Sequence, residues 1–178
     1  MHPHTMINLR SALALLIFGG CVGFVSAQNT LDNPDWTEEK EPPAPAFSTS
    51  KVLPLDMPNF VTVKVGIDPS TIMVGGDGVV RYVAVMTNAS GTSNAMYEGI
   101  RCLTGEVKTY ARAGSSGNWS VVSAPVWRDV MGNLPSPHAR VFARQAACDS
   151  RVAGSKAEIL NALKFGKNSP NYRALSEQ

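Results

Sequence analysis

Through the middle of the chain, hydrophobic and polar residues alternate with a period of two, which is typical of strands that bury one face. Clusters of glycine, asparagine, aspartate and serine separate these stretches and indicate turns. The stretch at 79–87 is apolar on both of its faces, so we expect it to be a central strand. The pattern predicts strands at 60–67, 71–74, 79–87, 95–103, 106–113 and 119–122.

The last third of the chain changes to a helical period. A helix is expected at 138–148, after a Ser-Pro pair. A second helix begins at Ser155, which forms the capping-box pattern with Glu158, and it ends at Gly166. Strands followed by helices predict a single α+β domain at residues 51–178, with an antiparallel sheet of about five to six strands followed by two C-terminal helices.

An acidic, proline-rich arm at residues 28–50 precedes this domain. Pro42, Pro43 and Pro45 exclude a helix and favour an extended chain. A tryptophan is costly to leave in water, so we expect the arm to dock on the domain through Trp36.

The chain begins with the features of a secretory signal peptide. Arg10 precedes an apolar stretch at 12–18, and Val25-Ser26-Ala27 supplies the small residues that a signal peptidase recognises. We therefore expect residues 1–27 to be removed and the mature protein to reside in the periplasm.

A lipoprotein is the alternative interpretation of the same segment. Cys21 follows two glycines, and an acyl chain on its sulfur would anchor the protein to the outer membrane. The longest apolar run, residues 12–25, is shorter than the roughly 20 residues that span a bilayer. We expect no transmembrane span in the mature chain.

Export determines how the cysteines are interpreted. Cys102 and Cys148 remain after residue 27, and two cysteines in an oxidising compartment predict one disulfide, with two unlinked thiols as the alternative. His138 is the one histidine beyond residue 27. This scarcity disfavours a zinc site and a catalytic cysteine with its base, so we expect no metal and no cofactor.

Charge is spread unevenly along the chain. Residues 28–80 are acidic and residues 81–178 are basic, while the formal net charge of +2 is too small to indicate a nucleic-acid-binding protein. We expect the two parts to neutralise each other in the fold. The alternative is a basic surface that binds an anionic partner, such as lipid head groups or an envelope polymer.

A hairpin defines the candidate binding surface. Thr104-Gly105 predicts a two-residue turn that pairs Arg101 with Lys108 and lays the ring of Tyr110 over Gly99. Like charges opposite each other need an anion, which Glu106 of the same hairpin or the acidic arm could supply. We expect the arm to fold back and neutralise this face, with an external anionic partner as the alternative. The alternation of side chains then gives a Tyr/Arg/Lys face made of Tyr97, Arg101, Lys108, Tyr110 and Arg112.

The opposite face of the hairpin is mostly apolar and is expected to face the core. Glu98 lies on that face and needs a partner, for which we predict Arg81 of the central strand. A small hydrolase using Glu98 is an alternative function, and it requires a second titratable group beside Glu98 in a cleft. The sequence contains no nucleophile elbow, phosphate loop or dinucleotide fingerprint.

One stretch of the hairpin is Tyr97-Glu98-Gly99-Ile100-Arg101-Cys102-Leu103-Thr104-Gly105-Glu106. It resembles the signature of the cryptic neisserial protein family, whose members are small exported proteobacterial proteins. The resemblance covers residues 35–148 and implies export and an envelope setting, without a reaction. We therefore predict a non-enzymatic envelope protein that binds or scaffolds an envelope protein or an anionic ligand through the Tyr/Arg/Lys face. Further matching segments are Asp35-Trp36, Asp68-Pro69-Ser70, residues 76–82, Trp119-Ser120 and Trp127-Arg128.

Overall fold

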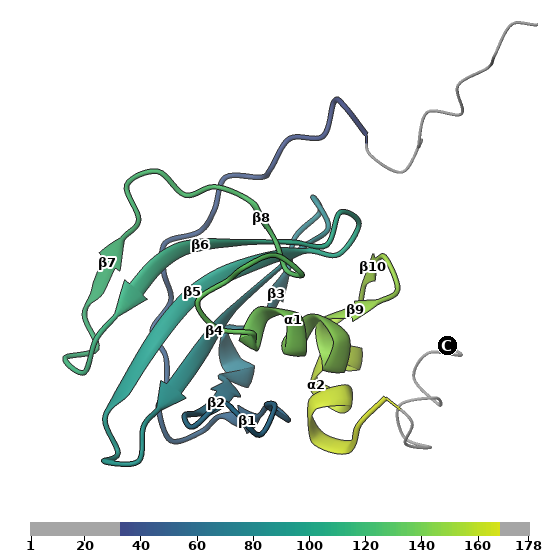
Figure 1. The fold of residues 1–178 in the computed structure, drawn as a ribbon. Coiled ribbons are helices and arrows are strands. Elements are labelled where there is room, and N and C mark those ends of the chain that lie inside the picture. The colour runs from purple at the N-terminus through teal and green to yellow at the C-terminus, as the bar shows by residue number, and fades with distance from the viewer. Residues whose placement is uncertain (1–32, 168–178) are drawn as a thin grey trace, which may run out of the picture. The chain divides into compact units, whose positions relative to one another are not determined.

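The computed structural model describes residues 33–167. Its centre is one antiparallel sheet with the order β1-β2-β4-β5-β6-β7, in which β3 also pairs with β4 and β8 with β6 (Figure 1). These strands are β1 (Leu53–Pro54), β2 (Lys64–Ile67), β3 (Met73–Val74), β4 (Val79–Thr87), β5 (Ser93–Arg101), β6 (Glu106–Ala113), β7 (Trp119–Val121) and β8 (Arg128–Asp129). The predicted α+β class is confirmed. The sheet has eight strands rather than the predicted five to six.

The C-terminal part forms helices and one short hairpin. Cys148, predicted to end the first helix, instead begins β9, because a π-helical turn ends that helix one residue earlier. The predicted capping box of the second helix is confirmed, and Gly166 ends that helix with a φ of 80°. These elements are α1 (His138–Phe142), the π-helix η2 (Ala143–Ala147), β9 (Cys148–Asp149), β10 (Val152–Ala153) and α2 (Lys156–Phe165); a 3-10 helix, η1 (Pro69–Thr71), lies between β2 and β3.

The sheet is covered on both faces. α1 and α2 lie on the face turned toward the viewer in Figure 1, and the arm runs behind the sheet. β4 is buried on both faces along most of its length, as predicted, because its alternate side chains pack in two cores on opposite sides of the sheet. The helix-side core includes Val80, Tyr82, Ala84, Ile100, Val107, Phe142 and Ile159, and the arm-side core includes Val83, Val85, Ala95, Tyr97, Tyr110 and Ala111.

The turn of the β5–β6 hairpin is longer than predicted. Arg101 pairs with Glu106 rather than with Lys108, so residues 102–105 form the turn. Gly105 closes it, since its N–H donates to the carbonyl of Arg101 at 2.9 Å and its φ is 71°. The prediction of a two-residue turn, and of the register that follows from it, is therefore wrong.

A β-bulge in β6 changes which face each later residue occupies. Tyr97 pairs with Ala111, but Glu98 pairs with Thr109, which leaves Tyr110 as the extra residue. Tyr110 and Ala111 both pack in the arm-side core, so the alternation of faces is displaced by one residue from that point. Arg112 consequently lies on the helix side.

The predicted disulfide between Cys102 and Cys148 is confirmed. The two Cα atoms are 5.5 Å apart, and 46 positions separate the residues in sequence. The bond joins the turn of the β5–β6 hairpin to the end of η2, so it holds the helical layer against the sheet.

The predictions for residues 1–27, including the signal peptide and Cys21, lie outside the described residues. Within the described part of the chain, neither α-helix has the length and hydrophobicity that a bilayer crossing requires.

Candidate functional site

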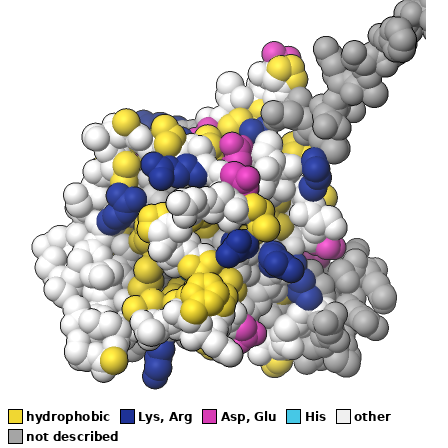
Figure 2. Space-filling model, viewed as in Figure 1, with side chains coloured by type: hydrophobic (Ala, Val, Ile, Leu, Met, Phe, Trp, Pro, Cys, Tyr) yellow, Lys and Arg dark blue, Asp and Glu magenta, His cyan; other side chains and the backbone are white. Residues whose placement is uncertain are grey.

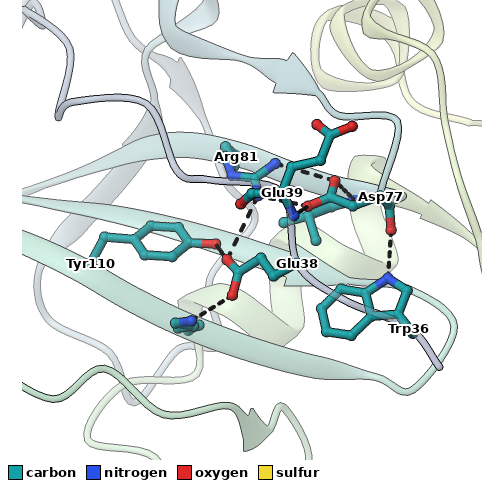
Figure 3. A network of polar contacts seen from close by, with 8 residues as sticks. Trp36, Glu38, Glu39, Asp77, Arg81 and Tyr110 are labelled. Carbon is teal, nitrogen blue, oxygen red and sulfur yellow. Dashed lines mark hydrogen bonds and ion pairs between the residues drawn. The ribbon is translucent and has the colours of Figure 1, made fainter. Parts of the chain in front are cut away.

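Two groups of polar residues flank the central strands, one on each side of the sheet. The first group lies under the arm, where Glu38 meets the Tyr/Arg/Lys face (Figure 3). The hydroxyl of Tyr110 donates to Glu38 Oε1 at 2.6 Å, and Lys108 Nζ lies 2.5 Å from Glu38 Oε2. The expectation that the arm folds back and neutralises this face is confirmed.

Arg81 anchors the same network from β4. Its guanidinium is 1% exposed and donates to both carboxylate oxygens of Asp77, at 3.2 and 2.7 Å, while Nη2 lies 3.6 Å from Glu38 Oε1. Burial would raise the pKa of Asp77, but the hydrogen bonds from Arg81 and from the backbone of Val79 and Glu39 lower it. The network is therefore a set of ion pairs closed within the chain.

The predicted pairing of Glu98 with Arg81 is wrong. In the β4–β5 ladder, Arg81 lies opposite Gly99, whereas Tyr82 lies opposite Glu98. Residues directly opposite each other share a face of the sheet, so Arg81 points to the arm side and Glu98 to the helix side.

Trp36 fixes the start of the arm, as predicted. Its indole N–H donates to the carbonyl of Asp77 at 2.9 Å, and the Arg101 guanidinium lies 3.8 Å from its ring centre. The ring of Trp127 meets Trp36 edge-on at 6.0 Å. These contacts place Arg101 on the side of the sheet where the arm docks.

The two tyrosines of the Tyr/Arg/Lys face are buried under the arm. Tyr97 is 2% exposed and packs against Tyr110, with ring centres 5.1 Å apart. Tyr110 lies over Gly99 as predicted, despite the shifted register: a Cβ built on Gly99 would approach the Tyr110 hydroxyl too closely and would lie 2.8 Å from Val79 Cγ1. The arm of the same chain thus occupies the face that the sequence offers for a ligand.

We expect Glu38→Gln to lower the free energy of unfolding by about 1–3 kcal/mol, because it removes the charge that Lys108, Tyr110 and Arg81 share. Denaturation in urea measures this change. Asp35→Asn is the matched control, since Asp35 is an exposed carboxylate of the same arm, and its effect should stay within about 0.5 kcal/mol. Equal effects of the two substitutions would contradict the role of Glu38.

The second polar group lies at a pocket on the helix side of the sheet, which we call the helix-side pocket. Its volume is about 340 Å³. It is bounded by β4, β5 and β6, by the start of α1 and by the segment between β7 and β8. Figure 2 shows this side of the molecule, where hydrophobic side chains gather with Lys and Arg side chains around them. The lining includes Met86, Met96, Val107, Val122, Val126 and Leu134, and the polar residues Glu98, Thr109, Arg112, Arg128, Ser136 and His138.

Glu98 and His138 form a buried pair in this lining. Glu98 is 2% exposed and His138 is 4% exposed. Glu98 Oε2 lies 2.7 Å from His138 Nε2 and accepts the hydroxyl of Tyr82 at 2.8 Å, while Oε1 accepts the hydroxyl of Thr109 at 3.0 Å. Every oxygen of this carboxylate therefore has a partner.

The pair is ionic. Burial would lower the pKa of His138, but the charge of Glu98 and the hydrogen bond to it raise that pKa above its ordinary value. Burial would raise the pKa of Glu98, but the charge of His138 and the hydrogen bonds from His138, Tyr82 and Thr109 lower it. His138 Nδ1 has no hydrogen-bond partner within residues 33–167. The imidazolium is thus held through Nε2 alone.

The structure separates the predicted binding residues. Tyr97, Arg101, Lys108 and Tyr110 lie on the arm side, whereas the bulge sends Arg112 to the helix-side pocket. The prediction of one continuous face that includes Arg112 is wrong because it assumed unbroken alternation.

Sequence reasoning missed Tyr82 and His138 as the partners of Glu98. His138 is 40 positions away, and its place depends on how α1 crosses the sheet, where Phe142 packs against Tyr82 with ring centres 4.4 Å apart. Tyr82 had a usable signal, because an antiparallel β4–β5 register places it opposite Glu98. In the described range 33–167, no group of three or more His, Cys, Asp or Glu side chains is placed to hold a metal ion.

The chain matches the model of a known protein family. The model of the CNP1-like family matches residues 31–164, which include most of the arm, the sheet and most of α2. Neither a curated protein nor a solved structure matches the chain.

Proposed function

The chain belongs to the CNP1-like family, and from that premise we propose that it is a non-enzymatic binding protein of the cell envelope whose ligand site is the helix-side pocket. The observation that carries this proposal is a pocket with apolar walls that contains a buried Glu98–His138 pair. Small-molecule sites commonly combine apolar walls with a few fixed polar groups.

The opposite side of the sheet offers less to an external ligand. Lys108 and Tyr110 already bind Glu38, and Arg101 already packs on Trp36. A ligand there would have to displace the arm together with its ion pairs and its docked tryptophan. The arm is therefore the partner of the Tyr/Arg/Lys face, and the free binding surface lies on the helix side.

Binding of a neutral probe tests this proposal. We expect 1-octanol to bind saturably and to shift the NMR signals of the Met86 and Met96 methyl groups, which line the helix-side pocket, while the signal of Met131, which does not line it, stays in place. Ala124→Trp should abolish the saturable shifts by filling the pocket, because Ala124 is an exposed lining residue. Ser123→Trp is the control, since Ser123 is exposed and adjacent but does not line the pocket. Shifts that persist in the Ala124→Trp variant, or that never occur, would overturn the proposal.

Export is part of the same proposal. The Cys102–Cys148 disulfide supports it, because structural disulfides persist mainly in oxidising compartments. The intact mass of the protein recovered from the envelope fraction tests it. A chain that starts at Gln28 is expected; a chain that starts at an acylated Cys21 would establish the lipoprotein alternative, and an uncleaved chain would contradict export.

Hydrolysis is the second candidate function, and the 2.7 Å contact between Glu98 and His138 in a pocket favours it. Against it, both oxygens of Glu98 are bonded, and His138 Nδ1 contacts no nucleophile within the described residues. We expect no protein-dependent hydrolysis of p-nitrophenyl acetate. Hydrolysis that is lost in a folded Glu98→Gln variant would establish the enzyme instead.

A further inference from the structure

We infer that the ligand of the helix-side pocket is an anionic amphiphile, with a carboxylate or phosphate head bound by Arg112 or Arg128 and an apolar body lying against Met86 and Met96. This inference rests on the proposed function and adds the charge and size of the ligand. Five observations carry it: the unpaired arginines, the neutralised carboxylate, the bulge at Tyr110, the placement of the methionines and the volume.

The two arginines of the pocket have no anionic partner. Arg112 and Arg128 are exposed, and neither makes an ion pair within residues 33–167. Among the other cations of the sheet, Arg81 binds Asp77, Lys108 binds Glu38 and Arg101 lies 3.8 Å from Glu106, whereas the exposed Lys64 of β2 makes no ion pair within the described residues. Two of the three sheet cations that lack an ion pair within the described residues therefore lie at this pocket.

The carboxylate in the pocket does not neutralise these arginines. Glu98 is the one acidic residue among the described lining residues, and its charge is matched by His138. Its oxygens also accept hydrogen bonds from Tyr82 and Thr109. The pocket consequently has an excess of positive charge, which favours an anionic ligand in a partly desolvated site.

The bulge at Tyr110 is what brings Arg112 to the pocket. In an unbroken ladder the residues of β6 that follow Val107 and Thr109 onto the helix side would be Ala111 and Ala113, and both instead pack in the arm-side core. Bulges are frequent next to functional sites, where they redirect a side chain. The bulge thus turns an unpaired arginine toward a pocket, and it is the clearest indication of a ligand site that this sheet offers.

The arginines approach the pocket from its two ends. Arg128 lies opposite Val107 in the β8–β6 ladder, whereas Arg112 is five positions further along β6, about 16 Å away at the usual strand rise. Met96 lies directly opposite Arg112, and Met86 is on the neighbouring strand. A ligand head at either end thus leaves the body of the ligand over the pocket, and the adaptable methionine side chains can pack against it.

The volume limits the size of the ligand. The pocket holds about 340 Å³. Since a water molecule in the liquid occupies about 30 Å³, this space suits a ligand of roughly ten non-hydrogen atoms. Octanoate has this size, and 1-octanol is its uncharged counterpart.

Comparing octanoate, octyl phosphate and 1-octanol at neutral pH tests the inference on the disulfide-bonded protein, with the Met86 and Met96 methyl signals as the readout. We expect at least one of the two anions to bind about tenfold or more tightly than 1-octanol, because a charge-assisted hydrogen bond forms only with the anion. The preferred anion distinguishes a carboxylate ligand from a phosphate ligand.

The double variant Arg112→Gln/Arg128→Gln should abolish the preference for the anion, so that the preferred anion and 1-octanol bind with similar affinity. Arg151→Gln is the control, because Arg151 is exposed, carries the same charge and does not line the pocket. The single variants show which end holds the head. Equal binding of all three probes, with the methionine shifts retained, would overturn the inference and leave the proposed function standing. Absence of any shift would overturn both.

Discussion

The double variant Cys102→Ser/Cys148→Ser is expected to have a free energy of unfolding about 4 kcal/mol lower than that of the disulfide-bonded protein. The disulfide closes a loop across 46 positions, and its loss returns that conformational freedom to the unfolded chain. The native contacts around it, between the hairpin turn and the end of η2, are buried and should reform without the bond.

Urea unfolding of the oxidised protein and of the double serine variant measures this difference. Reduction of the unsubstituted protein is the control for the serines themselves, and it should give a similar loss of stability. A loss below about 1 kcal/mol in both experiments would contradict the role of the bond as the clamp between the helices and the sheet.

Removal of the imidazole by His138→Ala is expected to cost about 3–5 kcal/mol, because it leaves the Glu98 carboxylate buried without its counter-charge. Within residues 33–167, the other partners of Glu98 are Tyr82 and Thr109, and both are neutral donors. The same change enlarges the helix-side pocket, which His138 lines.

A double-mutant cycle with Glu98→Gln measures how much of this loss of stability comes from the interaction between His138 and Glu98. In the double variant the remaining side chain is neutral, so we expect much of the stability lost in His138→Ala to return. Urea unfolding of both single variants and the double variant completes the cycle. Additive losses would mean that His138 stabilises the fold by packing and not through Glu98.

The pair also predicts how stability depends on pH. The pKa of folded His138 is raised, so its contribution is full below the ordinary value of 6.5 and is lost as the pH rises through the raised pKa. The pKa of folded Glu98 is lowered, so its contribution is full above the ordinary value of 4.5 and is lost as the pH falls through the lowered pKa. The stability advantage over the His138→Gln/Glu98→Gln variant should therefore be greatest between pH 4.5 and 6.5. An advantage that does not vary with pH would contradict an ion pair.

Much of the fold follows from local pattern. The central position of β4 is visible in its two apolar faces, and the capping box at Ser155 depends only on Ser155 and Glu158. The disulfide follows from the two cysteines left after the expected cleavage, and the docking of Trp36 follows from the cost of exposing an indole. These predictions succeed because each depends on neighbouring residues or on one strong physical preference.

The helix-side pocket could not be predicted in the same way. The bulge at Tyr110 has no strong local signal, yet it decides the face of Arg112. The Glu98–His138 contact depends on where α1 crosses the sheet, which the disulfide and the packing of Phe142 determine together. The error in pairing Glu98 with Arg81 also concerns register, because the β4–β5 register decides which residue lies opposite Glu98 and shares its face.

The structure shows what most residues of the signature stretch at 97–102 contact. Tyr97 and Arg101 support the arm, Gly99 leaves room for the ring of Tyr110, and Cys102 forms the disulfide. Glu98 alone of these residues turns its side chain to the helix-side pocket. The stretch thus joins the arm, the sheet and the pocket into one unit.

The nuclear Overhauser contacts between octanoate and the protein are the most direct measurement of the ligand site. We predict contacts from the methylene protons of octanoate to the methyl groups of Met86 and Met96 in the disulfide-bonded protein, and no contacts to Met131. Contacts confined to Met131 or to the arm, with none to Met86 or Met96, would place the bound molecule elsewhere and contradict the assignment of the helix-side pocket.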